Sequence, residues 1–464
     1  MSDFQMDMNL MDNGNRLKNA MEKGNFIFLA ECAIPVNENR REAAAERILP
    51  LAEMMAKQEG LCGGLAISDL PGTPWSSVEI GSAFPEELRN NNLYFISGRS
   101  RTEEMIREQL SLASNSGIRN LVPVSGDIYP GTVRESRGMN FYGSLQQLLL
   151  INGMEKDFFT GCVSNPFHYD GHTMLASCGA LAEKIDAGAQ FVVTQSGWDM
   201  LQNQALAWYL FRGKRFLPLI ARLTLLTPDR AEKILAGEVP GVRMTRAFAK
   251  LIQRELSAGK SQFEAAQYRR LELQSAGCRL MGYSGVQICG VDFPGKAALI
   301  ASRIRSALQE FRSFEHFLDE YNAHQASAEM SLGINKFHLF DRMLYRQYPL
   351  DEPPVMNAPE DVDFSFHERL MFRLKKFLFA KSDRERAGRD RILKKLLADC
   401  RGCDKCTLPE NEFLCIKNCP KKLLTGPCGG VREDGLCEIG SEECVFVKKV
   451  RSERFRKAVY GLES

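Results

Sequence analysis

Short apolar runs alternate with amphipathic stretches over roughly the first two-thirds of the chain. Eight short runs, most of them rich in Val, Ile, Leu or Phe, have the pattern of buried parallel strands. Between them, apolar residues recur at helical spacing, most clearly over 41–57, 103–113 and 173–187. The predicted strands are Phe26–Ala30, Gly64–Ser68, Leu93–Ser97, Asn120–Val124, Gly161–Ser164, Gln190–Thr194, Phe216–Ile220 and Gly285–Cys289.

Eight strands alternating with helices over roughly 290 residues predict an α/β fold of the (βα)8 TIM-barrel type. The alternative is a doubly wound open sheet, but no Gly-x-Gly-x-x-Gly follows the first strand. The long interval between the seventh and eighth strands is expected to hold two extra helices, near 241–258 and 262–275.

The pattern changes after the barrel, so the chain divides into three predicted regions. Residues 1–312 form the barrel. Residues 313–398 form a charged, helical linker region, which a turn signal at 348–354 interrupts. Residues 399–464 form a small cysteine-rich metal-binding module.

Composition excludes several functional classes. The chain has 464 residues and a net charge of +2, so no strong overall field favours nucleic acid or a membrane surface. No apolar run is long enough to cross a bilayer. The N-terminal residues are polar and lack the pattern of an export signal, so we expect a cytoplasmic protein.

Cysteine content is the unusual feature. Of 14 cysteines, eight lie between positions 400 and 444. In a long chain without an export signal, this density indicates metal ligation rather than disulfides. Eight thiolates can supply two four-ligand sites. The Cys-x-x-Cys-x-x-Cys spacing with a later Cys-Pro is similar to ferredoxin-type ligation of 4Fe-4S clusters, and zinc is the alternative. The predicted ligands are Cys400, Cys403, Cys406, Cys415, Cys419, Cys428, Cys437 and Cys444.

Polar residues stand where the predicted strands end, which is the working face of a βα barrel. A carboxyl group in a partly dry barrel mouth can have a raised pKa and donate a proton. Any one of these residues alone could simply cap a helix. Together they suit a polar heterocyclic substrate. They are Glu31 after the first strand, Ser68 in the second, Asp127 after the fourth, Asn165 at the fifth and Gln195 at the sixth.

The barrel region resembles the methylenetetrahydrofolate reductase family. The resemblance rests on Glu31, on Gly126-Asp127 followed by Pro130-Gly131, and on Lys184-x-Asp186-Ala187-Gly188-Ala189 leading to Thr194-Gln195. It covers about residues 24–312. In that family a flavin in the barrel mouth exchanges a hydride with the one-carbon unit of a folate.

The resemblance implies roles by position. Glu31 would be the general acid that opens methylenetetrahydrofolate to its iminium, Asp127 would adjoin flavin and pterin, and Gln195 would hydrogen-bond the pterin. Flavin contacts would come from Ser68, Asp127, Asn165 and Lys184. The chain departs from the family at several flavin contacts. Because of these departures, the cofactor could be FAD or FMN, and a barrel that has lost its flavin is a third alternative.

The cysteine module, on its segment from Cys419 to Glu438, is similar to the C-terminal domain of such reductases from acetogens and related anaerobes. This similarity implies electron delivery from ferredoxin or an electron-transfer subunit, and it is compatible with an oligomer or a larger complex. A basic stretch at 373–376 and 384–395 is either a solvated helix face or a surface for a redox partner. Two other functions stay open: a folate-dependent methyltransferase or demethylase, and a non-catalytic assembly subunit.

Overall fold

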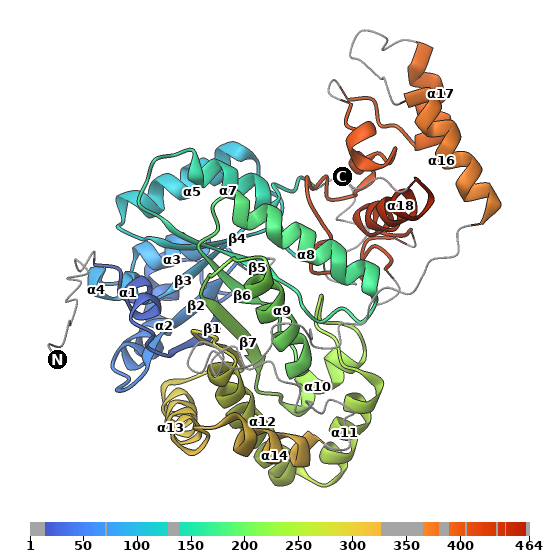
Figure 1. Cartoon of the computed structure of the whole chain (residues 1–464). Coiled ribbons are helices and arrows are strands. Elements are labelled where there is room, and N and C mark those ends of the chain that lie inside the picture. Colours follow the sequence, from blue (N-terminus) through green and yellow to red (C-terminus); the bar gives the residue numbers. More distant parts are fainter. Residues whose placement is uncertain are drawn as a thin grey trace, which may run out of the picture.

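The computed structural model describes residues 14–69, 72–128, 139–325, 365–379, 389–403, 406–432, 435–440 and 442–460. The predicted turn at 348–354 and the Pro130-Gly131 pair lie outside these residues. Eight parallel strands form a closed barrel in sequence order, and β8 pairs with β1 to close it (Figure 1). The strands are β1 (Ile27–Ala33), β2 (Cys62–Ser68), β3 (Leu93–Ser97), β4 (Asn120–Val124), β5 (Phe159–Ser164), β6 (Phe191–Thr194), β7 (Leu219–Thr224) and β8 (Gly285–Cys289).

The predicted TIM barrel is confirmed, and the open-sheet alternative is wrong. Helices surround the barrel, several of them capped by a Thr or Asp side chain that accepts a hydrogen bond from the first turn. The helices of this part are α1 (Arg16–Glu22), α2 (Arg41–Ala56), α3 (Ser77–Ser82), α4 (Glu86–Arg89), α5 (Glu103–Asn115), α7 (Ser144–Asn152), α8 (Gly171–Asp186), α9 (Met200–Arg212), α10 (Pro228–Leu235), α11 (Arg246–Ser257), α12 (Lys260–Leu280), α13 (Pro294–Glu310) and α14 (Phe314–Gln325).

The extra helices between β7 and β8 were predicted and are α11 and α12. Helix α14 falls within the predicted linker region, yet Phe317 and Tyr321 are buried in the same core as the barrel helices. The beginning of that region therefore belongs structurally to the barrel.

Five of the predicted strands have other bounds in the structure, and the differences in β7 and β1 bear on the site. β7 was predicted at Phe216–Ile220 but begins only after Pro218; the Phe216 side chain is 74% exposed. β1 extends to Ala33, so Glu31 lies inside the strand rather than after it.

The barrel interior is apolar at its lower end and polar at its upper end. Leu29 of β1 and Ile220 of β7 belong to the inner core, which the apolar face of α1 closes from below. Because strand side chains alternate, Glu31 and Arg222 lie two positions further on and point to the same interior. The upper end of the barrel therefore carries a charged layer directly above the apolar one.

The C-terminal part forms a second lobe (Figure 1). Helix α18 packs along α8 of the barrel, and apolar side chains of both parts share two small clusters. The elements of this lobe are α16 (Phe366–Phe379), α17 (Arg389–Ala398), η4 (Pro409–Asn411), η5 (Ile416–Asn418) and α18 (Val445–Tyr460). Within the described residues, no helix has the length and apolar character needed to cross a bilayer.

Candidate functional site

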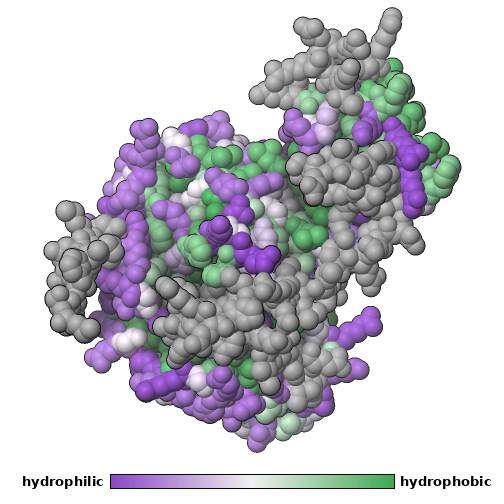
Figure 2. Space-filling model, viewed as in Figure 1, coloured by the Kyte–Doolittle hydropathy of each residue, from purple (hydrophilic) through white to green (hydrophobic). Residues whose placement is uncertain are grey.

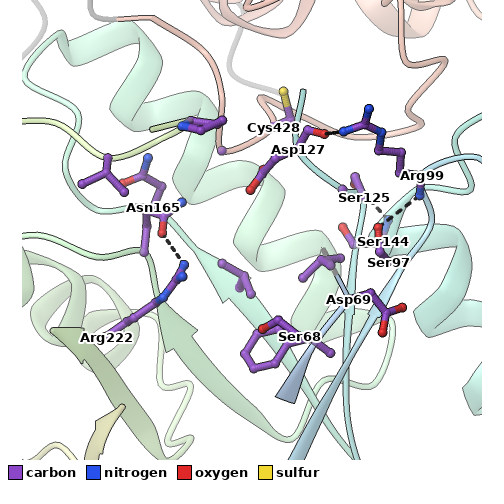
Figure 3. Close-up of a pocket in the computed structure, with 18 of the residues that line it drawn as sticks. Ser68, Asp69, Ser97, Arg99, Ser125, Asp127, Ser144, Asn165, Arg222 and Cys428 are labelled. Carbon is purple, nitrogen blue, oxygen red and sulfur yellow. Dashed lines mark hydrogen bonds between the residues drawn. The ribbon is translucent and has the colours of Figure 1, made fainter. Parts of the chain in front are cut away.

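A cavity of about 950 Å³ opens at the carboxyl ends of the barrel strands (Figure 3). Every barrel residue that the sequence predicted for the site lines it, so the fold brings the whole set together. These residues are Glu31, Ser68, Asp127, Asn165, Lys184 and Gln195. Their individual roles stay predictions.

Arg222 is the central side chain of this cavity, and the sequence analysis did not single it out. Its guanidinium donates two hydrogen bonds to the Glu31 carboxylate, from Nε and Nη2, both at 2.6 Å. Its Nη1 donates to Oε1 of Gln195 at 2.8 Å. A forked, charge-assisted pair of this kind is the strongest geometry for an Arg–carboxylate contact. Arg222 thus ties together two of the three predicted catalytic residues.

Glu31 is held as a carboxylate in this arrangement. Burial alone would raise its pKa, but the charge and hydrogen bonds of Arg222 and a 2.9 Å hydrogen bond from Gln287 outweigh burial, and the pKa is lowered. The expectation of a raised pKa is therefore wrong for Glu31, because Arg222, which is far away in the sequence, pairs with its carboxylate.

Asp127 shows the opposite behaviour. Its side chain contacts the solvent of the cavity, but confinement among protein atoms raises its pKa, and Glu438 adds to the effect while Lys421, Arg222 and Arg99 oppose it. Of the two predicted catalytic carboxyl groups, Asp127 is the one whose environment favours a bound proton.

The loop that carries Asp127 depends on Gly126. This residue has φ +88°, and a Cβ there would lie 2.6 Å from Cβ of Arg99 and 2.7 Å from Oγ of Ser97. The close approach lets Nη1 of Arg99 donate to the backbone oxygen of Asp127 at 2.7 Å. Glycine is thus required at this position both by its backbone conformation and by space.

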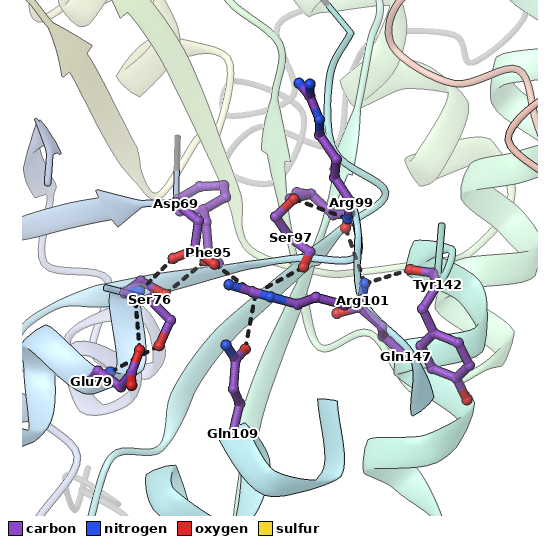
Figure 4. A network of polar contacts seen from close by, with 12 residues as sticks. Asp69, Ser76, Glu79, Phe95, Ser97, Arg99, Arg101, Gln109, Tyr142 and Gln147 are labelled. Atoms are coloured by element: carbon purple, nitrogen blue, oxygen red, sulfur yellow. Dashed lines mark hydrogen bonds and ion pairs between the residues drawn. The ribbon is translucent and has the colours of Figure 1, made fainter. Parts of the chain in front are cut away.

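A second ion pair fixes the loops after β2 and β3 (Figure 4). Nη1 of Arg101 lies 2.7 Å from Asp69, and it also donates to the Ser97 carbonyl at 2.9 Å and to Gln109 at 3.0 Å. Burial raises the pKa of Asp69 in spite of Arg101. This network orients the cavity wall that contains Ser68.

The opposite wall offers hydrogen-bond donors. Oδ1 of Asn165 accepts from the Phe167 amide at 3.1 Å, while its buried Nδ2 has no partner among the described residues. Nζ of Lys184 donates to the Val163 carbonyl at 2.9 Å, and burial lowers its pKa. An unpartnered buried donor that lines a cavity is a natural contact for a ligand acceptor.

The cysteine module covers the cavity. Residues 421–429, which we call the covering segment, supply Lys421, Leu423, Thr425, Pro427, Cys428 and Gly429 to its lining. Nζ of Lys421 donates to the Gly126 carbonyl at 2.7 Å and pairs with Glu438, whose Oε1 accepts from the Cys428 thiol at 3.2 Å. The module is therefore part of the site, although the sequence pattern predicted the barrel and the module as two separate units.

The eight module thiols fall into two groups. Burial raises the pKa of the Cys403 thiol, and the charges of the nearby Cys415, Cys406 and Cys400 raise it further. The other four thiols influence one another in the same way. The charge of Cys437 raises the pKa of Cys419, those of Cys444 and Cys419 raise the pKa of Cys428, and those of Cys419 and Cys437 raise the pKa of Cys444. We call the first set the outer thiol group and the second the inner thiol group. The groups are Cys400, Cys403, Cys406 and Cys415 (outer), and Cys419, Cys428, Cys437 and Cys444 (inner).

Both groups border one further cavity of about 680 Å³. All 14 cysteines are free thiols, so the donor set that two four-ligand metal sites need is present. Among the described residues, no three His, Cys, Asp or Glu side chains converge closely enough to hold a metal as they are placed here. The residue types and their grouping suit a metal, and the exact coordination geometry stays a prediction.

Comparison with known families decides the assignment. Residues 16–204 match the methylenetetrahydrofolate reductase family, and residues 379–460 match a family described as methylene-tetrahydrofolate reductase C terminal. The two matches together cover more than half of the chain. The chain therefore contains a methylenetetrahydrofolate reductase family domain and, after it, the C-terminal domain of such reductases.

Two solved structures are similar to this chain at a low level. One is an uncharacterized protein from Clostridium thermocellum that binds two copies of 5-methyl-5,6,7,8-tetrahydrofolic acid; it is 13% identical, with a TM-score of 0.48 over 62% of this chain and 98% of that chain. The other is a 2,3-dimethylmalate lyase of the PEP mutase/isocitrate lyase superfamily, 13% identical, with a TM-score of 0.33 over 72% and 92%. Likenesses this weak carry no argument about function. No curated protein matches the chain.

Gly241 tests how closely the covering segment must approach the barrel. It has φ +69°, and a Cβ there would lie 2.6 Å from the Gly429 oxygen and 2.7 Å from Nε2 of Gln195. We expect Gly241→Ala to displace the covering segment and to lower folate turnover about tenfold or more, since small misplacements of catalytic groups are costly.

Gly237 provides the matched control. It has φ +73° but open space around its Cα, so Gly237→Ala adds only backbone strain of about 1 kcal/mol. Turnover and the thermal midpoint should be measured for both variants. Equal turnover in Gly241→Ala and Gly237→Ala would show that the close approach of Gly241 to Gly429 does not matter for activity.

Proposed function

We propose that this chain is a flavin-dependent enzyme that reduces 5,10-methylenetetrahydrofolate to 5-methyltetrahydrofolate, or catalyses the reverse, with electrons delivered through its cysteine module. The observation that carries the proposal is the shared cavity. Glu31, Asp127 and Gln195 of the family-like barrel face the same space as Cys428 of the inner thiol group. A redox module that forms one wall of a folate-type pocket suits an electron-transfer route into that pocket.

The residues of the cavity suit a flavin, with FAD proposed and FMN as the alternative. The pyrimidine edge of a flavin needs hydrogen-bond donors, and the unpartnered Nδ2 of Asn165 is available as one. A phosphate needs cations and hydroxyl groups, and Arg99 with Ser97 and Ser125 line the rim. When bound, the flavin would supply the hydride transfer.

The inner and outer thiol groups suit 4Fe-4S clusters, with zinc as an alternative or additional metal. A cluster in the inner thiol group would be held by side chains that contact the barrel, because Cys437 packs near Ile128 and Phe141. Lys421 would contribute a positive charge between this group and the cavity. Iron–sulfur sites would give the module an electron-transfer role, whereas zinc would give it a structural one.

The chain's own residues would bind the pterin and supply the proton that the reaction needs. Reduction requires the bond between the one-carbon unit and N10 of the folate to open, and N10 then takes a proton. The family resemblance assigns this proton to Glu31, but Arg222 holds Glu31 as a carboxylate in the present arrangement. We propose that Asp127 carries the proton in this state, and that Glu31 can act as the acid only once Arg222 has turned away from it.

Two carboxamide variants separate these roles. We expect Glu31→Gln to keep folate binding and to lose most turnover. Asp127→Asn should lower turnover by about 10²–10⁴-fold, the range for loss of a general acid. An acid works in its protonated form, so activity that depends on Asp127 is present below its raised pKa and is lost as pH rises through it. The measurement is turnover against pH, with folate affinity measured alongside. A wild-type pH profile in Asp127→Asn would remove Asp127 from proton transfer.

An absorbance spectrum of anaerobically purified protein, with metal and flavin analysis of the same sample, tests the overall proposal. Flavin bands together with iron and sulfide would support it, and the released cofactor distinguishes FAD from FMN. Zinc without iron would contradict the electron route while leaving folate chemistry open. A flavin-free protein that transfers methyl groups from methyltetrahydrofolate would favour the methyltransferase alternative.

A further inference from the structure

Helices α16 and α17 expose large apolar side chains to solvent. Phe366 and Phe377 of α16 are 81% and 86% exposed, and Ile392 and Leu396 of α17 are each 76% exposed. Figure 2 shows apolar side chains gathered on the outer edge of the upper right lobe, where Figure 1 places these helices. We call this surface the α16/α17 face. It comprises Phe366, Leu370, Leu374, Phe377, Ile392, Leu393 and Leu396.

These side chains are not needed to attach the helices to the module. Helix α16 is attached through its other side, where Phe372 and Phe379 are buried with Phe413 and Cys415. The Phe372 and Phe413 rings make an edge contact at 5.7 Å. The exposed residues of α16 follow the 3–4-residue spacing of a single helix face. Contiguous exposed apolar surface of this kind marks an interaction site in soluble proteins.

The same two helices concentrate positive charge. They contain eight Lys or Arg residues and two Asp or Glu residues, whereas the complete chain has a net charge of only +2. The rest of the chain is therefore slightly acidic. Arg373 and Lys395 are both exposed beside the apolar residues. An apolar centre with a basic border is complementary to an acidic protein surface, which it attracts and orients over long range.

The α16/α17 face adjoins the outer thiol group. Cys406 and Cys415 pack in the cluster that anchors α16, and Cys403 is exposed at the end of the segment that follows α17. Lys375 of α16 and Lys395 of α17 line the same cavity as Cys400 and Cys415. A protein bound on this face would come next to the outer thiol group, at the end of the module away from the barrel cavity.

We propose that the α16/α17 face is the docking site of a small acidic electron-carrier protein of the iron–sulfur type. This inference rests on the proposed function, because it supplies the entry point of the electron route. In each encounter the reduced carrier would give one electron to the metal site that the outer thiol group would hold, so two encounters, with one proton taken from solvent, would supply one hydride equivalent. An anionic membrane or a second copy of the chain could also cover such a surface, but neither accounts for its position beside the outer thiol group.

The test measures binding of a small acidic bacterial ferredoxin to the full-length, metal-loaded protein, at about 50 mM and about 500 mM salt. We expect Arg373→Glu with Lys395→Glu, and separately Phe377→Ser with Ile392→Ser, to weaken binding about tenfold or more. The charge variant should also lose most of the salt dependence. The matched controls are Lys233→Glu on α10 and Phe216→Ser, both exposed and far from the face along the chain; they should change binding less than about twofold.

Three other outcomes contradict the proposal. Wild-type affinity in both double variants would rule out this face as the ferredoxin site. Binding of the wild type to vesicles of phosphatidylcholine and phosphatidylglycerol, lost in the variants while ferredoxin binding is kept, would assign the face to a membrane. Self-association lost in the variants while ferredoxin binding is kept would assign it to a second copy. Binding requires no turnover, so ferredoxin binding that depends on the face, in a protein inactive on folate, would preserve the docking site and reject the proposed function.

Discussion

Replacing Arg222 with leucine is expected to abolish most folate turnover and to destabilise the barrel by about 3 kcal/mol at neutral pH. The variant removes both hydrogen bonds to Glu31 and the one to Gln195, and it leaves the Glu31 carboxylate confined in the cavity without its cation. An uncompensated charge in a confined site costs far more than the intact pair contributes. Thermal midpoints and steady-state turnover, measured on the same preparations, check both parts.

The pH dependence of this loss has a defined sign. In the wild type the pKa of Glu31 is lowered below its ordinary value of 4.5, so the ion pair stabilises the fold above that value, and the stabilisation is lost as pH falls through the lowered pKa. In Arg222→Leu only burial remains as the dominant influence, and the pKa of Glu31 should be raised. The destabilisation should therefore be largest at neutral pH and shrink as pH falls toward 4.5.

The double variant Arg222→Leu with Glu31→Gln is the matched control. It removes both charges, so it should recover much of the thermal stability that Arg222→Leu loses, without recovering turnover. If Arg222→Leu kept wild-type stability at neutral pH, the ion pair would not govern the protonation of Glu31, and Glu31 would again be the simplest acid for the reaction.

The barrel was predictable because its strands are short, apolar and separated by helical patterns. Three of the eight strands, including β3 and β4, have the predicted bounds. β7 was predicted too early in the chain because Phe216 is a residue type common in strands. The strand begins only after Pro218, which has no amide hydrogen to donate to a neighbouring strand. With β7 at Leu219–Thr224, the alternation Ile220-x-Arg222 would have directed Arg222 into the barrel interior.

The site was predictable as a set of strand-end residues but not as an electrostatic system. Local sequence cannot show that Arg222, nearly two hundred positions after Glu31, reverses the shift of its pKa. Nor can it show that Lys421 of the module bonds to Gly126 of the barrel. Both contacts are long-range, and their only sequence signal was a charged residue in an otherwise apolar or glycine-rich context.

Serine substitutions within the two thiol groups are expected to cause a large loss of bound metal. If the groups are separate four-ligand sites, Cys403→Ser should lose the metal of the outer thiol group and keep about half of the total metal. Cys437→Ser should lose the inner metal and also weaken folate binding, because the inner thiol group contacts the barrel through Ile128 and Phe141. Metal content per chain and electron paramagnetic resonance of the reduced protein check these expectations.

The consequences for stability should differ between the two sites. Metal binding to a small thiolate site contributes directly to folding, on the order of 10 kcal/mol for structural zinc. Loss of the inner site should therefore release the covering segment from the cavity, whereas loss of the outer site should affect mainly α16 and α17, which pack on Cys415.

Cys178→Ser is the matched control, since this cysteine lies on α8 of the barrel, outside both thiol groups, and burial raises its pKa to about 12. It should retain all metal. Loss of all metal from Cys403→Ser with the barrel still folded would indicate one shared site instead of two. Loss restricted to one signal in each variant would show two separate metal sites, of which only the inner one, through Cys428, borders the cavity that also contains Glu31.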